Sequence, residues 1–173
     1  MLHSTSNLAA QQRYHDTLWN WDLYGQGWME EEFGNAVGAE PLSAGPGMAL
    51  QLIRKMLINE ELDSDCEPTG KLELLRMAPS KWLDNGKRIS IENMPTAFGA
   101  VTLTVQSQLS RNKISGKFVA TNGSSLKKVS LWLRHPAGMP IKAVFSNGQA
   151  QSEFAVDSIP LPASGTTEFE VEF

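Results

Sequence analysis

The sequence contains a single cysteine, Cys66, so no disulfide bond can form within the chain. Basic residues are also few, because 15 Lys and Arg stand against 19 Asp and Glu and give a formal net charge of -4. This balance argues against nucleic acid as a partner, since nucleic-acid recognition requires a basic surface. No apolar run approaches the roughly 18 residues of a membrane span. The first residues lack the basic and apolar segments of a secretory signal peptide. We expect no nucleic-acid or membrane partner, and the sequence assigns no compartment.

Motifs that would hold a metal or activate a nucleophile are missing as well. The three histidines, His3, His15 and His135, have no metal-ligand spacing, and no Ser-His-Asp order or nucleophile elbow is present. Residues 43–47 precede a predicted helix, but they lack the Lys-Ser/Thr of a phosphate-binding loop, and Pro46 has no N–H to offer. We therefore expect no metal and no cofactor, and a plain turn at 43–47.

The N-terminal part of the chain has the pattern of helices around a glycine-rich loop. Residues 4–24 contain no Pro and no Gly and begin with a Ser-Thr-Ser capping sequence, which predicts a helix. Gly25 to Gly47 holds six glycines and two prolines and is predicted to be a loop. Met48 to Leu62 places apolar residues at helical spacing and is the clearest predicted helix. Lys71 to Met77 is predicted to be a short strand.

From Arg88 onward, apolar residues recur at every second position, which is the period of a β-strand. The last residues show it most clearly, because Phe169, Val171 and Phe173 alternate with glutamates. Turn-forming clusters separate the runs at spacings near 10 residues, a pattern typical of an antiparallel sandwich. We predict about seven or eight short strands in this part of the chain.

The segment Ser130 to Gln149 carries the strongest local signals. Residues 130–134 alternate as in a strand, His135 to Gly138 predicts a turn, and Ile141 to Phe145 predicts a second strand. Asn147-Gly148 is the most specific short signal for a β-hairpin turn. The segment is therefore predicted to contain two strands joined by a Pro/Gly turn.

Together these patterns predict an α+β fold in which an N-terminal helical pair with a Gly-rich loop packs on a C-terminal antiparallel β-sandwich of about seven or eight strands. The predicted helical segment covers residues 1–77, a connection covers 78–86, and the sandwich covers 87–173.

Several motifs resemble one protein family. They are Ala-Pro-Ser-Lys-Trp-Leu-Asp-Asn-Gly-Lys-Arg-Ile at 78–89, Asn-Met-Pro-Thr-Ala-Phe-Gly at 93–99, Leu-Trp-Leu-Arg-His-Pro-Ala-Gly-Met-Pro-Ile-Lys at 131–142, and Asn147-Gly148. The chain looks like the C-terminal part of large bacterial glycoside-hydrolase-like proteins, in which an (α/α)6 six-hairpin barrel precedes a β-sandwich. Trp-Met-Glu-Glu-Glu-Phe-Gly-Asn at 28–35, followed by Gly-Pro-Gly at 45–47, is similar to the last helical hairpin of such a barrel.

The resemblance implies that the chain is a non-catalytic accessory or structural region of a carbohydrate-active protein. A six-hairpin barrel needs many more helices than the two predicted here. We therefore expect this sequence to be the tail of a longer protein, or a remnant of one, with Met1 as an internal or artificial start. We expect no turnover from this chain alone, whereas the parent protein would be a glycoside hydrolase.

Three consecutive carboxylates in the Gly-rich loop, Glu30, Glu31 and Glu32, are the candidate catalytic residues of the parent protein. Glycoside hydrolysis uses two carboxylates across the scissile bond, and the aromatic neighbours Trp28 and Phe33 would raise a carboxyl pKa. The alternative is a solvated acidic first turn of a short helix.

Aromatic residues of the N-terminal part could stack on sugar rings, and more often such residues pack in a core or between domains. The candidates for stacking are Trp19, Trp21, Tyr24 and Trp28, and Trp82 and Trp132 share the ambiguity. Two alternative functions follow. One is a stand-alone carbohydrate-binding module that uses exposed tryptophans. The other is a structural domain that forms a homo-oligomer through its N-terminal helices.

Overall fold

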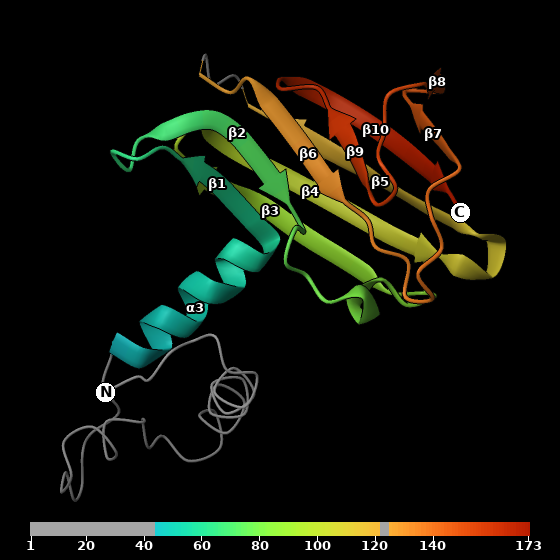
Figure 1. Ribbon diagram of the computed structural model, residues 1–173, viewed down its shortest axis with the longest axis horizontal. Coiled ribbons are helices and arrows are strands. Elements are labelled where there is room, and N and C mark those ends of the chain that lie inside the picture. The colour runs from blue at the N-terminus through green and yellow to red at the C-terminus, as the bar shows by residue number, and fades with distance from the viewer. Residues whose placement is uncertain (1–43, 122–124) are drawn as a thin grey trace, which may run out of the picture. The chain divides into compact units, whose positions relative to one another are not determined.

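The computed structural model describes residues 44–121 and 125–173 (Figure 1). The predicted helix at 4–24 and the Gly-rich loop up to residue 43 lie outside these residues. The described chain is a β-rich α+β fold with one α-helix and two sheets. Two 3-10 helices, η1 (Ser80–Leu83) and η2 (Leu109–Arg111), accompany them. The main elements are α3 (Ala44–Leu57), β1 (Ile58–Leu62), β2 (Pro68–Leu74), β3 (Arg88–Thr96), β4 (Gly99–Gln108), β5 (Lys113–Ala120), β6 (Lys128–Trp132), β7 (Ala143–Ser146), β8 (Gln149–Gln151), β9 (Ser158–Leu161) and β10 (Gly165–Glu172).

The helix predicted at Met48 to Leu62 is misplaced at both ends. It begins at Ala44, so that Pro46 lies within its first turn. A proline is tolerated there, because the N–H that it lacks would have had no partner within the helix. It ends at Leu57, and Ile58–Leu62 is strand β1 instead. The Ile58 side chain is fully buried opposite Leu74 of β2. Pairing with the next strand of the chain thus overrides the local helical pattern.

The end of α3 is also held by a charged contact. Arg54 Nη2 lies 2.6 Å from Glu60 Oε1 on β1 and donates to the carbonyl oxygen of Pro95 at 2.8 Å. Glu60 in turn accepts a hydrogen bond from the Ala97 amide at 3.0 Å. The helix-to-strand junction is therefore tied to the turn that joins β3 and β4.

The four-stranded sheet has the order β1-β2-β6-β9. The pairs β1–β2 and β6–β9 are antiparallel, whereas β2 and β6 are parallel, with Leu72 beside Val129. The prediction of purely antiparallel pairing is wrong at this position. Between β2 and β6 the chain passes through three strands of the other sheet and returns in the same direction. The strand predicted at Lys71 to Met77 is present as β2, but it begins at Pro68 and ends at Leu74, and β1 was not predicted.

The six-stranded sheet has the order β3-β4-β5-β10-β7-β8, and all its described pairs are antiparallel. Eight strands, β3 to β10, follow Arg88, which agrees with the predicted seven or eight. The predicted alternation at the end of the chain is confirmed. Phe169, Val171 and Phe173 are buried, and the glutamates between them are partly or fully exposed.

The segment Ser130 to Gln149 differs in part from its prediction. Asn147 and Gly148 both have positive φ, 50° and 78°, and form the two-residue turn of the β7–β8 hairpin, as expected. The strands on either side of the His135 turn do not pair, however, because β6 belongs to the four-stranded sheet and β7 to the six-stranded one. This segment therefore carries the chain from one sheet to the other.

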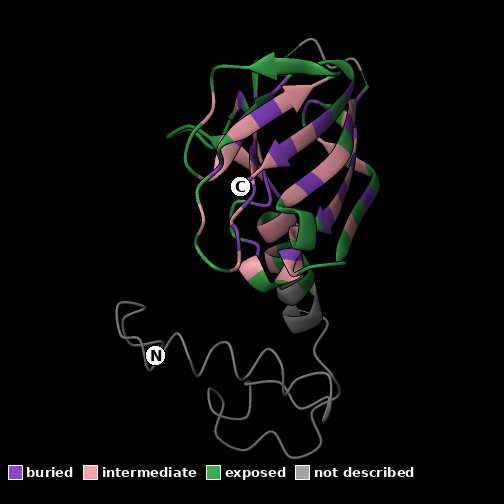
Figure 2. Cartoon of the chain, turned by 90° about the vertical axis from the view of Figure 1, so that its right-hand side faces the viewer, coloured by how far each residue is buried: buried purple, intermediate pink, exposed green. Residues whose placement is uncertain are grey.

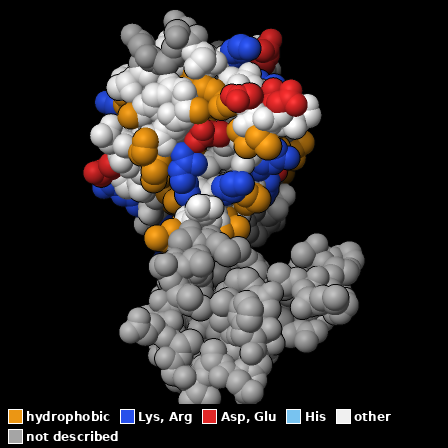
Figure 3. Space-filling model, turned by 90° about the vertical axis from the view of Figure 1, so that its left-hand side faces the viewer, with side chains coloured by type: hydrophobic (Ala, Val, Ile, Leu, Met, Phe, Trp, Pro, Cys, Tyr) orange, Lys and Arg blue, Asp and Glu red, His pale blue; other side chains and the backbone are white. Residues whose placement is uncertain are grey.

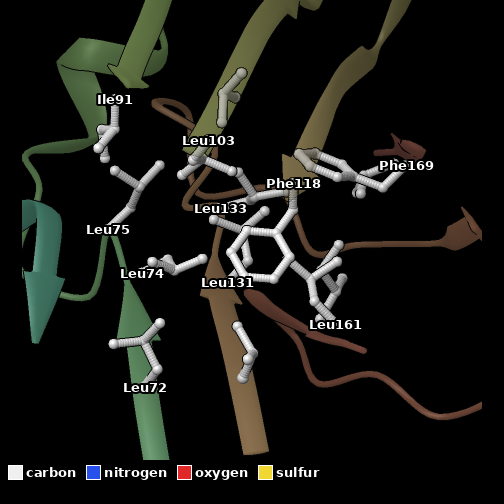
Figure 4. Packing of buried hydrophobic residues seen from close by; sticks show 14 of the residues in the cluster. Leu72, Leu74, Leu75, Ile91, Leu103, Phe118, Leu131, Leu133, Leu161 and Phe169 are labelled. Carbon is white, nitrogen blue, oxygen red and sulfur yellow. The ribbon is translucent and has the colours of Figure 1, made fainter. Parts of the chain in front are cut away.

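Both sheets contribute to one cluster of buried hydrophobic side chains. In Figure 4, Leu72, Leu74, Leu131 and Leu161 of the four-stranded sheet lie near Leu103, Phe118 and Phe169 of the six-stranded one. Figure 2 shows the consequence along the strands, where buried positions alternate with partly buried or exposed ones. Most strands thus bury one face in the core and leave the other face available for contacts outside it, whereas the edge strand β8 is exposed throughout.

Gly116 on β5 lies very close to its neighbours in the six-stranded sheet. A Cβ atom at this position would lie 2.1 Å from the Thr104 carbonyl oxygen and 2.4 Å from Cζ of Phe169. Phe169 is the cross-strand partner of Gly116 on β10 and is only 3% exposed. The ring therefore occupies the space that any larger residue at 116 would need.

We predict that Gly116→Ala lowers the free energy of unfolding by about 1–3 kcal/mol, because the backbone and a buried ring must move to admit the methyl group. Urea denaturation measures this change. Ser115→Ala is the matched control on the same strand and should change stability by less than about 0.5 kcal/mol. Equal unfolding midpoints for Gly116→Ala and the unaltered chain would contradict the close packing described here.

Candidate functional site

The residues that the sequence predicted for catalysis and stacking lie outside the described part of the chain. They are Glu30, Glu31, Glu32, Trp19, Trp21, Tyr24 and Trp28. Within residues 44–121 and 125–173, no group of three or more His, Cys, Asp or Glu side chains is arranged to hold a metal ion. No helix in those ranges is long and apolar enough to cross a membrane.

A cavity of about 700 Å³ opens to solvent at the six-stranded sheet. We name it the outer-face cavity, because most of its lining side chains alternate with core residues and point away from the core. The strands that line it are β5, β10 and β7, together with the β7–β8 turn. Its lining residues are Lys113, Ser115, Gly116, Lys117, Phe145, Gly148, Glu168, Phe169, Glu170 and Glu172.

Strand register brings these side chains together. Lys113 lies opposite Glu172, Ser115 opposite Glu170, and Lys117 opposite Glu168 in the β5–β10 pair. On the other side of β10, Glu170 lies opposite Phe145 of β7. A row of three glutamates therefore runs along the middle strand, with lysines on one side and an aromatic ring on the other.

The lysines and glutamates form ion pairs. Lys113 Nζ lies 2.7 Å from Glu170 Oε1 and 3.0 Å from Glu172 Oε1, and Lys117 Nζ lies 3.8 Å from Glu168 Oε1. Hydrogen bonds to Glu170 and then to Glu172 raise the pKa of Lys113 above its ordinary value. Lys113 therefore stays charged at neutral pH. The cavity offers hydrogen-bond donors and acceptors side by side.

Phe145 supplies the apolar element of the outer-face cavity. Both Phe145 and Phe169 line it, but Phe169 belongs to the core, whereas Phe145 is half-buried on the outer face. Ala150 lies beside Phe145 on β8, so the small side chain leaves the ring uncrowded on that strand. The sequence placed Phe145 in a strand but did not mark it as a site residue. The other residues of the cavity come from β5 and β10. They lie near Phe145 only because β7 pairs with β10 and β10 pairs with β5, and these strands are far apart in the sequence.

Trp132 lies on the outer face of the four-stranded sheet, opposite in direction to the buried Leu131. The guanidinium carbons of Arg76 and Arg134 lie over its ring at 5.6 and 5.2 Å from the ring centroid. Arg134 is itself held by Asp157, with Nε 3.2 Å from Oδ2. Both guanidinium groups lie close enough to the ring for a cation–π interaction. Trp132 thus contributes a cation–π cluster, and Trp82 in η1 packs partly buried against the core.

Charged side chains of both signs are mixed on the surface. Besides the outer-face cavity, ion pairs join Arg54 to Glu60 at 2.6 Å and Lys71 to Glu61 at 2.8 Å. Figure 3 shows basic and acidic side chains close together on one face. The described residues on that face therefore produce no extended field of one sign, which is the feature that would concentrate a highly charged ligand.

His135 is buried in the connection between the sheets. Its Nδ1 accepts a hydrogen bond from the Ala137 amide at 3.0 Å, and its carbonyl oxygen accepts one from Gly138 at 2.8 Å. The ring packs against Phe173 with a centroid distance of 5.0 Å. Burial lowers the pKa of His135. The predicted role of His135 in a turn is confirmed, and its neutral ring is part of that turn.

The acidic side chains of the outer-face cavity stand in one row along β10. Its three glutamates come from one strand, so they do not flank a bound ligand from opposite sides, as hydrolysis of a glycosidic bond requires. Comparisons of this chain with models of protein families, with curated proteins and with solved structures give no match.

We predict that the folded state loses stability as the pH falls below about 6.5, the ordinary pKa of histidine. The pKa of His135 is lowered in the folded state, so the unfolded chain binds more protons in this range and is favoured. The stabilisation is complete above pH 6.5 and is lost as the pH falls through the folded-state pKa. Protonation of Nδ1 would also break its bond to the Ala137 amide.

Urea denaturation at pH 7.5 and pH 5.5 measures this effect. His135→Asn is the control, because the asparagine side-chain oxygen can accept the Ala137 hydrogen bond but does not titrate. The unaltered chain should lose more stability between the two pH values than the variant does. Identical losses would show that His135 is not responsible.

Proposed function

We propose that the described strands form a β-sandwich that serves as a non-catalytic accessory domain of a carbohydrate-active, glycoside-hydrolase-like protein. The hydrophobic cluster shared by the two sheets supports the sandwich. The motifs at residues 78–89, 93–99 and 131–142 support the link to carbohydrate-active proteins, through their resemblance to the C-terminal region of six-hairpin proteins.

The observation that carries the non-catalytic role is the arrangement of charges in the outer-face cavity. Lys113 is bonded to both Glu170 and Glu172, and the third glutamate lies near Lys117. A glycosidase needs one carboxylic acid that protonates the leaving group and a second carboxylate across the bond. A row of ion-paired glutamates on one strand meets neither requirement. In this proposal, hydrolysis belongs to the barrel of the parent protein, where Glu30, Glu31 and Glu32 are the candidates from this chain.

A second candidate function is self-association through α3. Two apolar side chains three positions apart on this helix, Leu50 and Ile53, are 68% and 48% exposed. Residues at this spacing share one face of a helix. A second copy of the chain would bury them, and this favours a structural, oligomer-forming role.

For the accessory role, we predict that the purified chain releases no reducing sugar from a panel of polysaccharides and aryl glycosides. Turnover that disappears in a variant with Glu30, Glu31 and Glu32 all changed to Gln would contradict the non-catalytic role.

For the longer parent protein, we predict that the coding sequence upstream of Met1 continues in frame and encodes further helical hairpins. A stop codon directly upstream of Met1 would contradict the longer parent protein.

For self-association, we predict a dimer by light scattering at micromolar concentration. Changing Leu50 and Ile53 together to Ser should produce a monomer, because the apolar contact is lost. Lys55→Ser, an exposed position on the same helix, is the control and should leave the dimer intact. A monomer at every concentration of the unaltered chain would remove this candidate.

A further inference from the structure

The outer-face cavity combines two features that a sugar ring requires. The C–H groups of a pyranose form an apolar patch that packs on an aromatic ring, and its hydroxyl groups each need donors and acceptors. Phe145 offers a half-buried ring at one side of the cavity. Lys113 and Lys117 supply donors, and the glutamates of β10 supply acceptors, on the floor beside that ring.

Strand register sets how far these groups lie from one another. Phe145 is directly opposite Glu170 on β10, and Glu170 is directly opposite Ser115 on β5. Neighbouring strands are about 4.8 Å apart, so Phe145 and Ser115 lie roughly 10 Å apart across the glutamate row. A sugar ring placed on Phe145 thus reaches the ion pairs of β10 and β5 with its hydroxyl groups. All these side chains stand on strands, which hold them more rigidly than loops would.

The charges indicate a neutral ligand. Two lysines and three glutamates line the cavity, so these side chains carry a formal charge of -1. An anionic ligand would be repelled by the three carboxylates, and a cationic ligand would be repelled by the two ammonium groups. A hydroxyl group can accept from an ammonium group and donate to a carboxylate at the same time, and so it can join an ion pair without leaving either charge unpaired.

The size of the cavity agrees with a small saccharide. Its volume of about 700 Å³ lies within the range of about 300–1,000 Å³ that is usual for small-molecule sites. The cavity is open, so a sugar chain can extend from it into solvent. The site would accept one or two sugar units of a longer glycan.

From these features we infer that the outer-face cavity binds a neutral saccharide, with Phe145 as the stacking surface and Lys113, Glu170 and Ser115 as hydrogen-bonding partners. This inference rests on the proposed function and names the ligand class and the site through which the accessory domain acts. It adds a carbohydrate contact at a phenylalanine of the six-stranded sheet to the stacking predicted for the N-terminal tryptophans, which lie outside the described residues.

Isothermal titration calorimetry of the full chain tests the inference. The probes are maltose, cellobiose, lactose and xylobiose, with digalacturonic acid as the acidic counterpart. At least one neutral disaccharide should bind more tightly than digalacturonic acid. Phe145→Ala should weaken that binding about tenfold or more, because the stacking surface is lost, whereas Phe145→Tyr retains a ring and should keep it.

Two further variants test the site, one inside the cavity and one control outside it. Glu170→Gln alters the floor of the cavity with nearly unchanged shape and should also weaken binding. Lys128→Ala, exposed on the other sheet, should bind as the unaltered chain does. Circular dichroism and urea midpoints establish that each variant is folded.

The possible failures are distinguishable. If no neutral disaccharide binds, or if folded Phe145→Ala and Glu170→Gln both bind unchanged, the inference is overturned. The proposed accessory role would then be structural, without a sugar-binding site in the outer-face cavity. Hydrolysis of a probe during the titration, detected by chromatography of the recovered sugar, would overturn the non-catalytic function itself.

Discussion

The rest of the structure depends on the burial of side chains from two sheets in one hydrophobic cluster. Leu131 of the four-stranded sheet and Phe118 of the six-stranded sheet are both fully buried there. Each such residue contributes about 1.5–3 kcal/mol by removal from water. Because side chains alternate along a strand, the register that buries Phe169 also turns Glu168 and Glu170 outward. The outer-face cavity is therefore a consequence of how the core is packed.

The path of the chain between the sheets completes the cavity. After β6, the turn at His135 carries the chain from the four-stranded sheet to the six-stranded sheet, where β7 pairs with β10. This pairing sets Phe145 beside Glu170, and the Asn147 turn then closes the edge hairpin. The buried ring of His135 thus belongs to the connection that leads into β7, the strand that carries Phe145.

Local sequence patterns predicted the features that depend on neighbouring residues. The period-2 alternation after Arg88 and the Asn147-Gly148 turn are both present, because strand pleat and turn geometry depend on a few adjacent residues. The end of α3 at Leu57 and the parallel pairing of β2 with β6 were not predictable in this way. The first depends on the pairing of β1 with the next strand, β2, and the second depends on a partner far along the chain. The candidate site shows the same limit: the alternating glutamates were visible in the sequence, but Phe145 became their neighbour only through the pairing of β7 with β10.

The proposed carbohydrate contact lies on the outer face of the six-stranded sheet, and the role proposed for the Trp132 cluster on the other sheet is structural. Mapping backbone amide shifts by NMR tests this assignment most directly, with a neutral disaccharide added to the isotope-labelled chain. The shifts should concentrate in β5, β10 and β7 around Phe145, with β2 and β6 unchanged. Shifts centred on Trp132 and its arginines, or no shifts in β5, β10 and β7, would contradict the proposed binding site.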